Sequence, residues 1–494
     1  MTEPGSTGQS EPSGKALVEE VPGAPAPREV LTRLHGLPGR VLLESAGGGA
    51  GYSLFACDPV LVFRVREGRA TLAGESAVTG SGGLDVSGTA LDALEVLLGT
   101  LRGPPPPAGI PFAGGMIGYL AYEVGDLLED LPPPPPDDVG MPEAWFGVYD
   151  RALLWDHPSG RCRAVATPLP GRSPREARSR LRELVSVVLG AGPVASDSAP
   201  WATRGSAARA SGPLSPSSKP ISSLTESGFK KGVERIRDYI RAGDLFQANL
   251  TRRISVVAKG LQGDAFYEKL VGESPAAFAA YLDTGEGEVA SISPELFLSL
   301  RGDRIETRPI KGTARRGTTP EEDVHRRQWL MASEKDRAEN VMIVDLLRND
   351  LSRVSRPGSI AVPELVALET HPTVHHLRST VVGRLEPGLG PIDLLRATFP
   401  GGSITGAPKI RAMEVLRELE PVRRGVYTGT LGILGFHGDL DLSVAIRTAV
   451  LRDGWVRYGT GGGITLSSDP DEEWIESRDK AKAFFRALAI EEEP

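Results

Sequence analysis

The stretch VAIRTAV, residues 444–450, places residues that favour strands at every second position, namely Val444, Ile446, Thr448 and Val450. This period of two predicts a β-strand, in which successive side chains point to opposite faces. Arg447 lies within the series, so we expect its guanidinium on the face opposite Ile446, where it could bind a carboxylate bidentately. An ordinary surface arginine is the alternative interpretation.

Amphipathic helical segments are interleaved with such strands from about residue 225 onward. One of them has an apolar stripe at helical spacing followed by a glycine that could cap its C-terminal end: Phe229, Val233, Ile236 and Ile240, then Gly243. A mixture of period-two strands and amphipathic helices indicates an α+β fold.

Composition divides the chain into four parts. Residues 1–28 are small, polar and rich in proline, which predicts a disordered tail because such a segment buries too little apolar surface to fold. Residues 29–191 form a first folded region. Residues 192–223, dominated by Ala, Ser and Pro, predict a flexible linker. Residues 224–490 form the second region and carry most of the chemically informative motifs.

The overall composition of the 494 residues, 40% hydrophobic and 24% charged, is that of an ordinary globular protein. The 56 basic and 64 acidic residues give a net charge of -8 without a basic tract, which argues against nucleic acid as a partner. No apolar run of about 18 residues and no apolar leader occur, so we expect no membrane contact and a cytoplasmic location. Cys57 and Cys162 stand far apart, which predicts neither a disulfide framework nor a thiolate zinc site.

Acidic residues share one face of a predicted helix in the second region. Ser333 is a suitable N-cap for a helix on which Asp336 and Glu339 stand three residues apart, about one turn from each other. Another helix start is indicated by Asp469 followed by Pro470.

On that later helix, Glu473, Glu476 and Lys480 share a face beside an inward stripe made of Trp474, Arg478, Ala481, Phe485 and Leu488. If the two helices converge, several carboxylates without thiolates would suit Mg²⁺, which prefers oxygen ligands. The alternative for each acidic pair is a solvated helix face. A nitrogen-rich metal site at His371, His375 and His376 is a further interpretation, although no partner motif such as HExxH accompanies these histidines.

Two glycine-rich segments fail as nucleotide-binding loops. Residues 401–409 lack the Lys and Ser or Thr of a phosphate-binding loop and predict instead a tight turn whose amides could hold an anion, then a helix. We expect that helix to begin at Pro408 with a buried stripe of Ile410, Met413 and Leu416. Residues 459–463 lack the third glycine of a dinucleotide fingerprint, and their bare amides fit a bound carboxylate better, with a plain turn as the alternative.

A series of short motifs runs in fixed order through the second region: Ser293–Phe297, Pro309–Thr313, Asp336–Asn340, Asp345–Asp350, His375–Leu377, Gly406–Lys409, Ile446–Thr448 and the glycine run before Glu473 and Glu476. In this order they resemble the chorismate-utilising enzymes, which include the large subunits of anthranilate synthase and aminodeoxychorismate synthase, isochorismate synthase and salicylate synthase. The first region resembles the family more thinly, at residues 42–45 and 112–119. The resemblance implies a layered α/β/β/α sandwich of mostly antiparallel sheets, built from both regions.

The resemblance also implies roles for individual residues. Mg²⁺ would be held by Glu339 and Glu476, with Asp336 and Glu473 close by, and would bind the ring carboxylate of chorismate. Glu295 would protonate the departing C4 hydroxyl, and His376 would support that region. The remaining substrate-binding set would be Arg447 and the amides of Gly461, Gly462 and Gly463 at the enolpyruvyl carboxylate, with Gln247, Thr313, Ser403, Thr405 and Lys480.

Two positions separate the branches of the family. Isochorismate and salicylate synthases have a lysine base where this chain has Gln247, and a glutamine cannot accept the proton of an attacking water. Anthranilate synthases have alanine where this chain has Lys311, whereas aminodeoxychorismate synthases keep the lysine as a nucleophile. The resemblance therefore favours amination of chorismate at C4, with Lys311 as a catalytic residue and the anthranilate synthase large subunit as the alternative. A structural ion pair with the acidic cluster is the other reading of Lys311.

Amination requires ammonia, and the chain has no Cys-His-Glu amidotransferase signature, so we expect a separate glutaminase subunit as partner. No recognisable pyridoxal-phosphate lyase segment is present, so release of pyruvate would fall to another enzyme. Glu44 and Ser45 resemble the tryptophan pocket of the anthranilate branch, which makes a tryptophan site a further possibility.

Overall fold

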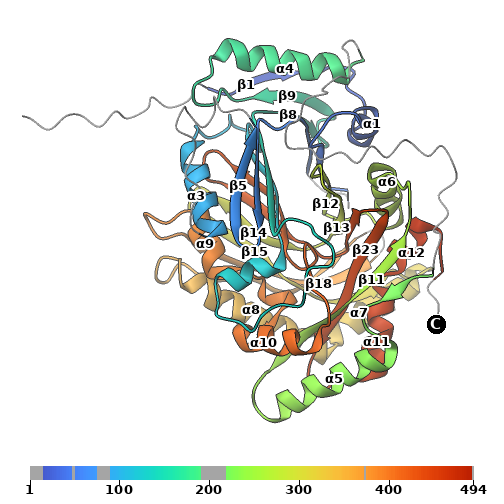
Figure 1. Cartoon of the computed structure of the whole chain (residues 1–494). Helices are drawn as coiled ribbons and strands as arrows, with labels where there is room; N and C mark the ends of the chain where they lie inside the picture. Colours follow the sequence, from blue (N-terminus) through green and yellow to red (C-terminus); the bar gives the residue numbers. More distant parts are fainter. Residues whose placement is uncertain (1–14, 47–50, 75–88, 191–218, 372–373, 492–494) are drawn as a thin grey trace, which may run out of the picture.

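The computed structural model describes residues 15–46, 51–74, 89–190, 219–371 and 374–491, which form two antiparallel sheets packed face to face (Figure 1). We call the first one sheet A. Its strands in spatial order are β1 (Leu17–Glu20), β9 (Arg161–Ala166), β8 (Arg151–Asp156), β3 (Tyr52–Ala56), β2 (Val41–Glu44), β12 (Phe278–Asp283), β13 (Glu288–Ser293), β22 (Thr448–Arg452), β23 (Trp455–Ile464), β11 (Gln247–Val257) and β10 (Ile221–Ser222), with β19 (Gly406–Ala407) against β11.

We call the second one sheet B. Its strands in spatial order are β16 (Ile310–Arg315), β18 (Val374–Arg384), β15 (Arg304–Arg308), β14 (Leu296–Arg301), β21 (Leu440–Val444), β20 (Thr430–Gly435), β6 (Gly115–Leu120), β7 (Ala144–Tyr149), β4 (Leu61–Arg66) and β5 (Arg69–Gly74), with β17 (Ala361–Thr370) against β18. The facing surfaces of the two sheets bury Tyr119, Trp145 and Tyr149 between them. Alternate residues of the same strands, such as Phe146, point outward beneath the helices.

Helices cover the outer face of each sheet. Sheet A is covered by α1 (Pro27–Arg33), α4 (Pro174–Val188), α6 (Gly263–Glu273) and α12 (Lys482–Leu488). Sheet B is covered by α3 (Ala90–Thr100), α8 (Glu334–Ser352) and α9 (Pro391–Thr398). The predicted α/β/β/α sandwich is therefore confirmed.

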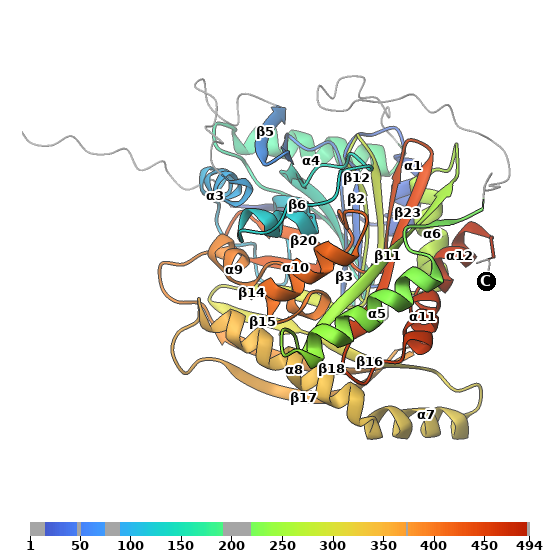
Figure 2. The same ribbon diagram turned by 60° about the horizontal axis from the view of Figure 1, so that its bottom comes forward.

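A third group of helices packs at the end of sheet A around β11, where α5 crosses the strand beside α11 (Figure 2). This group consists of α5 (Glu226–Arg241), α10 (Lys409–Leu419) and α11 (Pro470–Asp479). α7 (Pro320–Ala332) packs against β16 and β18, and two short 3-10 helices, η1 (Tyr122–Leu127) and η2 (Gly402–Ile404), complete the elements.

Both predicted regions contribute strands to both sheets. In sheet A, β2 of the first region pairs with β12 of the second, and in sheet B, β6 pairs with β20. The regions divided by composition are thus interleaved in space, since each depends on the other for strand pairing.

The expected boundaries of the tail and the linker need correction. β1 and the first residues of α1 lie within residues 1–28, because Leu17–Glu20 pairs along its whole length with β9. β10 lies within residues 192–223 and pairs with β11. The rest of these two predictions, at residues 1–14 and 192–218, lies outside the described residues.

Local predictions for the helices agree with the structure in most places. Phe229, Val233 and Ile236 are buried on α5, and Gly243 follows the helix with a φ of 84°. The expected burial of Ile410 is wrong, because its side chain is 44% exposed at the start of α10. The helix predicted from Pro470 onward is divided, since α11 ends at Asp479 and α12 begins at Lys482.

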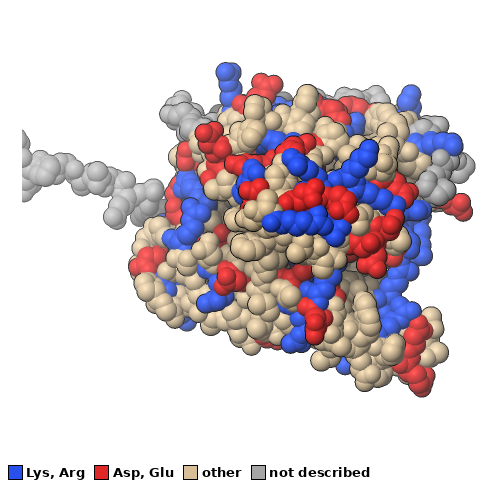
Figure 3. All heavy atoms as spheres, turned by 90° about the horizontal axis from the view of Figure 1, so that it is seen from below, with Lys and Arg blue, Asp and Glu red and all other residues tan. Residues whose placement is uncertain are grey.

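Charge and hydropathy of the folded chain agree with the composition. None of the helices in the described ranges combines the length and the apolar content needed to cross a bilayer. Acidic and basic side chains are interspersed over the face seen in Figure 3. Cys57 and Cys162 are both buried and carry free thiols, as the predicted lack of a disulfide requires.

Candidate active site

The chain crosses between the two sheets at two adjacent places. Residues 294–295 connect β13 of sheet A to β14 of sheet B, and residues 445–447 connect β21 of sheet B to β22 of sheet A. The crossings are joined by backbone hydrogen bonds, since the amide of Val444 donates to the carbonyl of Glu295 (3.1 Å) and that of Ile292 to the carbonyl of Arg447 (3.0 Å). This junction fixes Glu295 and Arg447 relative to each other.

Glu295 is a buried carboxyl group at the first crossing. Its Oε1 accepts a hydrogen bond of 2.5 Å from the hydroxyl of Ser403 on η2. Burial raises the pKa of Glu295 to about 7, while Ser403, Lys311 and Lys480 act in the opposite direction. A carboxyl group that gains and loses its proton near neutrality is suited to general acid catalysis.

Arg447 lies in the second crossing, so the prediction that it belongs to a strand is wrong. β21 ends at Val444 and β22 begins at Thr448. Arg447 has a φ of 52°, in the left-handed region that residues other than glycine rarely adopt. Its guanidinium donates to the carbonyl of Lys480 (2.7 Å). The surrounding packing therefore imposes a specific orientation on this cation.

Lys311 lies on β16 at an irregularity of the sheet. The pairing of β16 with β18 shifts register between Ile310 and Thr313, and a bulge of this kind re-aims side chains. The Nζ atom of Lys311 lies 3.2 Å from the point where a Cβ atom on Gly463 would stand. The next residue, Gly312, has a φ of 82° and lies against Asp336 of α8. The bulge thus brings the amine to the glycine-rich strand of sheet A.

Gln247 faces the same glycine. It is fully buried, and neither amide atom has a hydrogen-bond partner among the described residues. Its Nε2 atom lies less than 3.0 Å from the Cβ position of Gly463, closer than a real methyl group could approach. An unsatisfied buried amide is costly unless a ligand completes it, so Gln247 is consistent with a binding role.

The glycine run is a strand, whereas a turn was one expectation. Gly461, Gly462 and Gly463 lie within β23 and pair with Thr251, Leu250 and Asn249 of β11, respectively. The ladder between β22 and β23 reaches only as far as Tyr458, so the glycines lie beyond it. Because these glycines carry no side chains, their backbone is open to close approach by other groups, and any side chain at these positions would fill that space.

Carboxylates gather on the other side of this strand. A Cβ atom on Gly462 would stand 3.0 Å from Oε2 of Glu473 and 3.5 Å from Oε1 of Glu476. Glu473 also accepts hydrogen bonds from Ser468 (2.7 Å) and Lys335 (3.2 Å). Glu476 is paired with Lys480 at 2.5 Å.

The surroundings of these carboxyl groups shift their pKa values in different directions. Burial raises the pKa of Glu339, with Glu473 and Asp336 adding to the effect. Burial and the neighbouring Glu476 likewise raise the pKa of Glu473. The ammonium group of Lys480 is the main reason that the pKa of Glu476 is lowered. The mutual influence places carboxylates from α8 and α11 in one electrostatic cluster.

The cluster fits a hard divalent cation in its donor chemistry. Within the part of the chain that the structure describes, buried oxygens without a hydrogen-bond partner remain on Glu339 (Oε1) and Glu473 (Oε2), one from each helix. Among the described residues no group of three or more potential ligands lies close enough to enclose a metal ion. Mg²⁺ suits such an arrangement, because it commonly binds one or two carboxylates and completes its shell with water and substrate.

His376 lies on β18 beside Lys311's strand. Its Nδ1 atom is 2.9 Å from the hydroxyl of Thr313, and its ring also bonds to the backbone of Gly312. Burial, followed by the electrostatic influence of His371 and Arg447, lowers the pKa of His376 to about 4. The imidazole is therefore neutral near pH 7 and can orient neighbours by hydrogen bonding.

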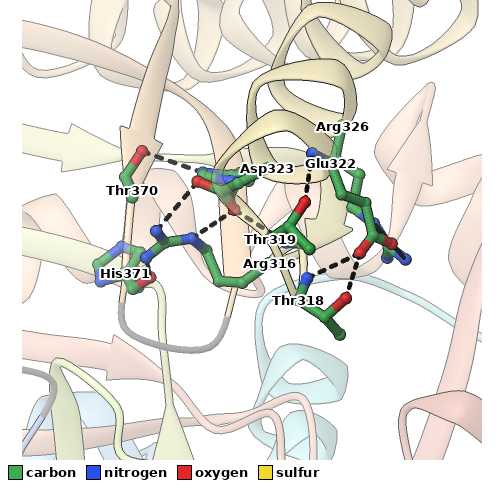
Figure 4. Close-up of polar contacts among 10 residues, drawn as sticks. Arg316, Thr318, Thr319, Glu322, Asp323, Arg326, Thr370 and His371 are labelled. Atoms are coloured by element: carbon green, nitrogen blue, oxygen red, sulfur yellow. Dashed lines mark hydrogen bonds and ion pairs between the residues drawn. The ribbon is translucent and has the colours of Figure 1, made fainter.

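The neighbouring His375 belongs to a separate structural network, and Figure 4 shows Arg316, Asp323 and Thr370 of that network. Its ring nitrogens contact Asp323 (2.9 Å) and Thr370 (3.0 Å), and Asp323 also forms two hydrogen bonds with Arg316 (2.7 and 3.0 Å). This network fastens α7 to β16 and β18. Both ring nitrogens of His375 are engaged, so the alternative of a common metal site for the three histidines is wrong.

Of the two predicted site residues in the turn before α10, only one contacts another group of the site within the described part of the chain. Ser403 reaches Glu295, but the hydroxyl of Thr405 donates to the carbonyl of Gly401 (2.9 Å) inside the turn. Lys335 and Tyr427 also lie near these groups, and the sequence motifs do not single them out. Lys335, one helical turn before Glu339, could have been found from that spacing, whereas Tyr427 contacts Gly459 only through tertiary packing.

Glu44 and Ser45 lie apart from this site. Glu44 is buried at the end of β2, where it accepts hydrogen bonds from Tyr267 (2.7 Å) and Arg28 (3.0 Å). β12, β13 and β22 separate β2 from the glycine-rich β23 in sheet A. Tryptophan binding there stays a prediction.

A family model described as "chorismate binding enzyme" matches residues 66–486. The chain is 38% identical over 457 residues to "Aminodeoxychorismate synthase component 1" of Salmonella typhimurium, covering 92% of this chain and 93% of that protein. It is 40% identical over 391 residues to "Anthranilate synthase component 1" of Streptomyces coelicolor, covering 78% and 74% of the two chains. The structure is similar to that of anthranilate synthase component I from Streptococcus pneumoniae, with a TM-score of 0.74, 31% identity, and coverage of 88% of this chain and 92% of that one.

Proposed function

The chain belongs to the chorismate binding enzyme family, and from that premise we propose that it aminates chorismate at C4 to give 4-amino-4-deoxychorismate for p-aminobenzoate and folate synthesis. Ammonia would come from a separate glutaminase subunit, as the designation of similar proteins as component 1 suggests. The observation that carries this proposal is the position of the Lys311 amine, 3.2 Å from the point where a Cβ atom on Gly463 would stand. The amide of Gln247, which has no hydrogen-bond partner among the described residues, lies against the same point.

The proposed reaction has two displacement steps. The neutral amine of Lys311 forms a bond to C2 of the ring, the double bond shifts, and the C4 hydroxyl leaves as water with a proton from Glu295. Ammonia then forms a bond to C4, the double bond shifts back as the C2–N bond to Lys311 breaks, and the new ammonium group at C4 returns a proton to Glu295, which restores both residues. The net change replaces one hydroxyl group with one amino group, with loss of water.

Binding residues would surround these reacting atoms. Arg447 and the amides of Gly462 and Gly463 would hold the enolpyruvyl carboxylate, since a guanidinium and backbone donors both match a carboxylate. Thr313 and His376 would support the region of the C4 hydroxyl. A bound Mg²⁺ would neutralise the ring carboxylate.

The cation would be held by residues of the carboxylate cluster. Glu339 and Glu473 each present an oxygen that no described residue hydrogen-bonds. Glu476 would contribute after exchanging its contact with Lys480, and Asp336 would lie close by. This set matches the one that the resemblance implies, with Glu473 favoured more strongly by its free oxygen.

The second candidate function is the anthranilate synthase reaction, because proteins so named are also similar to this chain. The two reactions give different products from chorismate, Mg²⁺ and ammonium salts. Anthranilate is fluorescent and forms directly, whereas p-aminobenzoate forms only after a lyase is added. Anthranilate as the main product of the unaltered protein would overturn the proposal.

Lys311→Ala tests the nucleophile itself. We expect formation of aminodeoxychorismate to fall by more than about 1,000-fold, with any residual activity directed to anthranilate. Lys482→Ala is a matched control, because Lys482 is half exposed on α12 and pairs only with Asp479 among the described residues. An unchanged rate and product in Lys311→Ala would contradict the covalent role.

A further inference from the structure

On the basis of the proposed function, we propose that Arg424 is a positioning residue for the acid Glu295. Its guanidinium fixes the turn that carries Ser403 to β11, and this connection keeps the hydroxyl of Ser403 on the Glu295 carboxyl group. Arg424 belongs to the segment between α10 and β20 and is not among the residues that the sequence motifs single out.

The guanidinium of Arg424 joins two parts of the active site. Its side chain is only 3% exposed. Nη1 donates to the carbonyl of Ile404 in η2 (2.9 Å), and Nη2 donates to the carbonyl of Asn249 on β11 (2.7 Å). Asn249 pairs with Gly463, the glycine beside Lys311. One side chain therefore holds both the turn and the glycine-bearing part of sheet A.

Glu420 in turn fixes the guanidinium. It accepts two hydrogen bonds from Arg424, at 2.8 and 2.7 Å, in the planar geometry that an arginine offers and a lysine does not. Glu420 also accepts from the amide of Thr251 on β11 (2.8 Å). The ring of Tyr122 covers the guanidinium at 4.5 Å.

The connection to the acid runs through adjacent residues of the turn. Ser403, next to Ile404, donates to Glu295 at 2.5 Å. The amide of Asn249 donates to the carbonyl of Thr405 at 2.9 Å, so the turn and β11 are joined at a second point. A displaced Ile404 would carry Ser403 away from the carboxyl group.

Loss of the Ser403 contact has a definite consequence for protonation. Burial raises the pKa of Glu295, while that hydrogen bond lowers it, as do the neighbouring Lys311 and Lys480. Without the bond, the pKa of Glu295 rises and the acid stays protonated to higher pH. The alkaline limb of the pH profile, where turnover falls because the acid loses its proton, then moves upward.

The test is the pH profile of kcat/KM for chorismate, measured with ammonium salts at a fixed concentration of neutral ammonia. For Arg424→Lys we expect the alkaline limb to move upward by about one pH unit, together with a lower kcat, because an ammonium group cannot hold both carbonyls and Glu420. Ser403→Ala should move the limb in the same direction, and the double variant should move it no further than Ser403→Ala alone.

Two control variants separate positioning from general destabilisation. Arg40 is another buried arginine, which forms an ion pair of 2.9 Å with Asp264 and lies outside the site. Arg40→Lys should therefore lower thermal stability and leave the alkaline limb in place. Glu123 accepts from the amide of Arg424 at 2.8 Å, and burial raises its pKa to about 7. Glu123→Gln should also leave the limb in place, which excludes this second carboxyl group as its origin.

The outcomes distinguish a failure of the acid role of Glu295 from a failure of the positioning role of Arg424. If Ser403→Ala leaves the limb unchanged, the acid role of Glu295 is wrong and the positioning role falls with it. If Ser403→Ala moves the limb but Arg424→Lys only lowers stability, as Arg40→Lys does, the positioning role alone is wrong. If Arg424→Lys does not fold, Glu420→Gln replaces it in the test, with a smaller upward movement expected and an unmoved limb counting against the proposal.

Discussion

Gly463→Ala is the smallest change that tests whether the bare strand of sheet A lines the reaction site. A methyl group there would stand less than 3.0 Å from Nε2 of Gln247 and 3.2 Å from Nζ of Lys311. Gln247 is fully buried and cannot swing into solvent, so one or both side chains must move by roughly 0.5–1 Å to restore van der Waals contact. The strain falls on the two groups proposed to act on the substrate.

A displacement of this size at reacting atoms costs about 100-fold in rate, or about 2.7 kcal/mol in activation free energy. We expect kcat/KM for chorismate in Gly463→Ala to fall by about that factor with ammonium as nitrogen source. The backbone of Gly463 does not require a positive φ, so alanine is tolerated there and the thermal midpoint should change by only a few degrees.

Gly272→Ala is the matched control. Gly272 lies near the end of α6, where a Cβ atom would meet no atom of the described residues within 4 Å. Alanine should therefore leave the rate unchanged and stabilise the protein by roughly 0.5–1 kcal/mol. Full activity in Gly463→Ala with ordinary folding would refute the reasoning, because a methyl group cannot occupy that point while both side chains keep their positions.

Other predictions address the acid, the cation and the packing of the site. Burial raises the pKa of Glu295 to about 7, so turnover at a fixed concentration of neutral ammonia should be highest below pH 7 and fall above it. Glu295→Gln should lower kcat by about 100-fold or more and remove this pH dependence. Chelation of divalent cations should abolish turnover, added Mg²⁺ should restore it and raise the thermal midpoint, and Glu339→Gln should need at least about tenfold more Mg²⁺ for both effects. The buried pair between Lys409 and Asp350, at 2.6 Å, fastens α10 to α8, so Lys409→Met should destabilise the protein by about 3 kcal/mol in urea unfolding, and a stability equal to that of the unaltered protein would contradict this.

Features that depend on a few neighbouring residues were predictable from the sequence. Ser333 caps α8 and Asp469 caps α11 as expected, because a cap needs only a short side chain and the amides two or three residues later. The stripe on α5 was equally predictable, since helical spacing alone determines which side chains share a face.

Features that depend on distant parts of the chain were not predictable from the sequence. The pattern around Arg447 has the period of a strand, yet the chain crosses there from one sheet to the other. Leu17–Glu20 looks like part of a polar tail, but β9 offers it an edge to pair with. The glycine run reads as a turn, but β11 pairs with it residue by residue. In the last two cases a partner strand outweighs the local preference.

The amino-acid sequence by itself determined which chemical groups this protein has available and the α+β alternation that carries them, and its motifs indicated the family. Only the tertiary structure decided which groups meet. Glu295 and Ser403 are 108 residues apart and are joined because two sheet crossings and the Arg424 contacts bring η2 to β14. Lys311 reaches Gly463 through a bulge on one sheet and a bare strand on the other. The physical reason is that strand register and crossings fix positions between distant segments, whereas hydrogen bonds within a segment fix only its local shape.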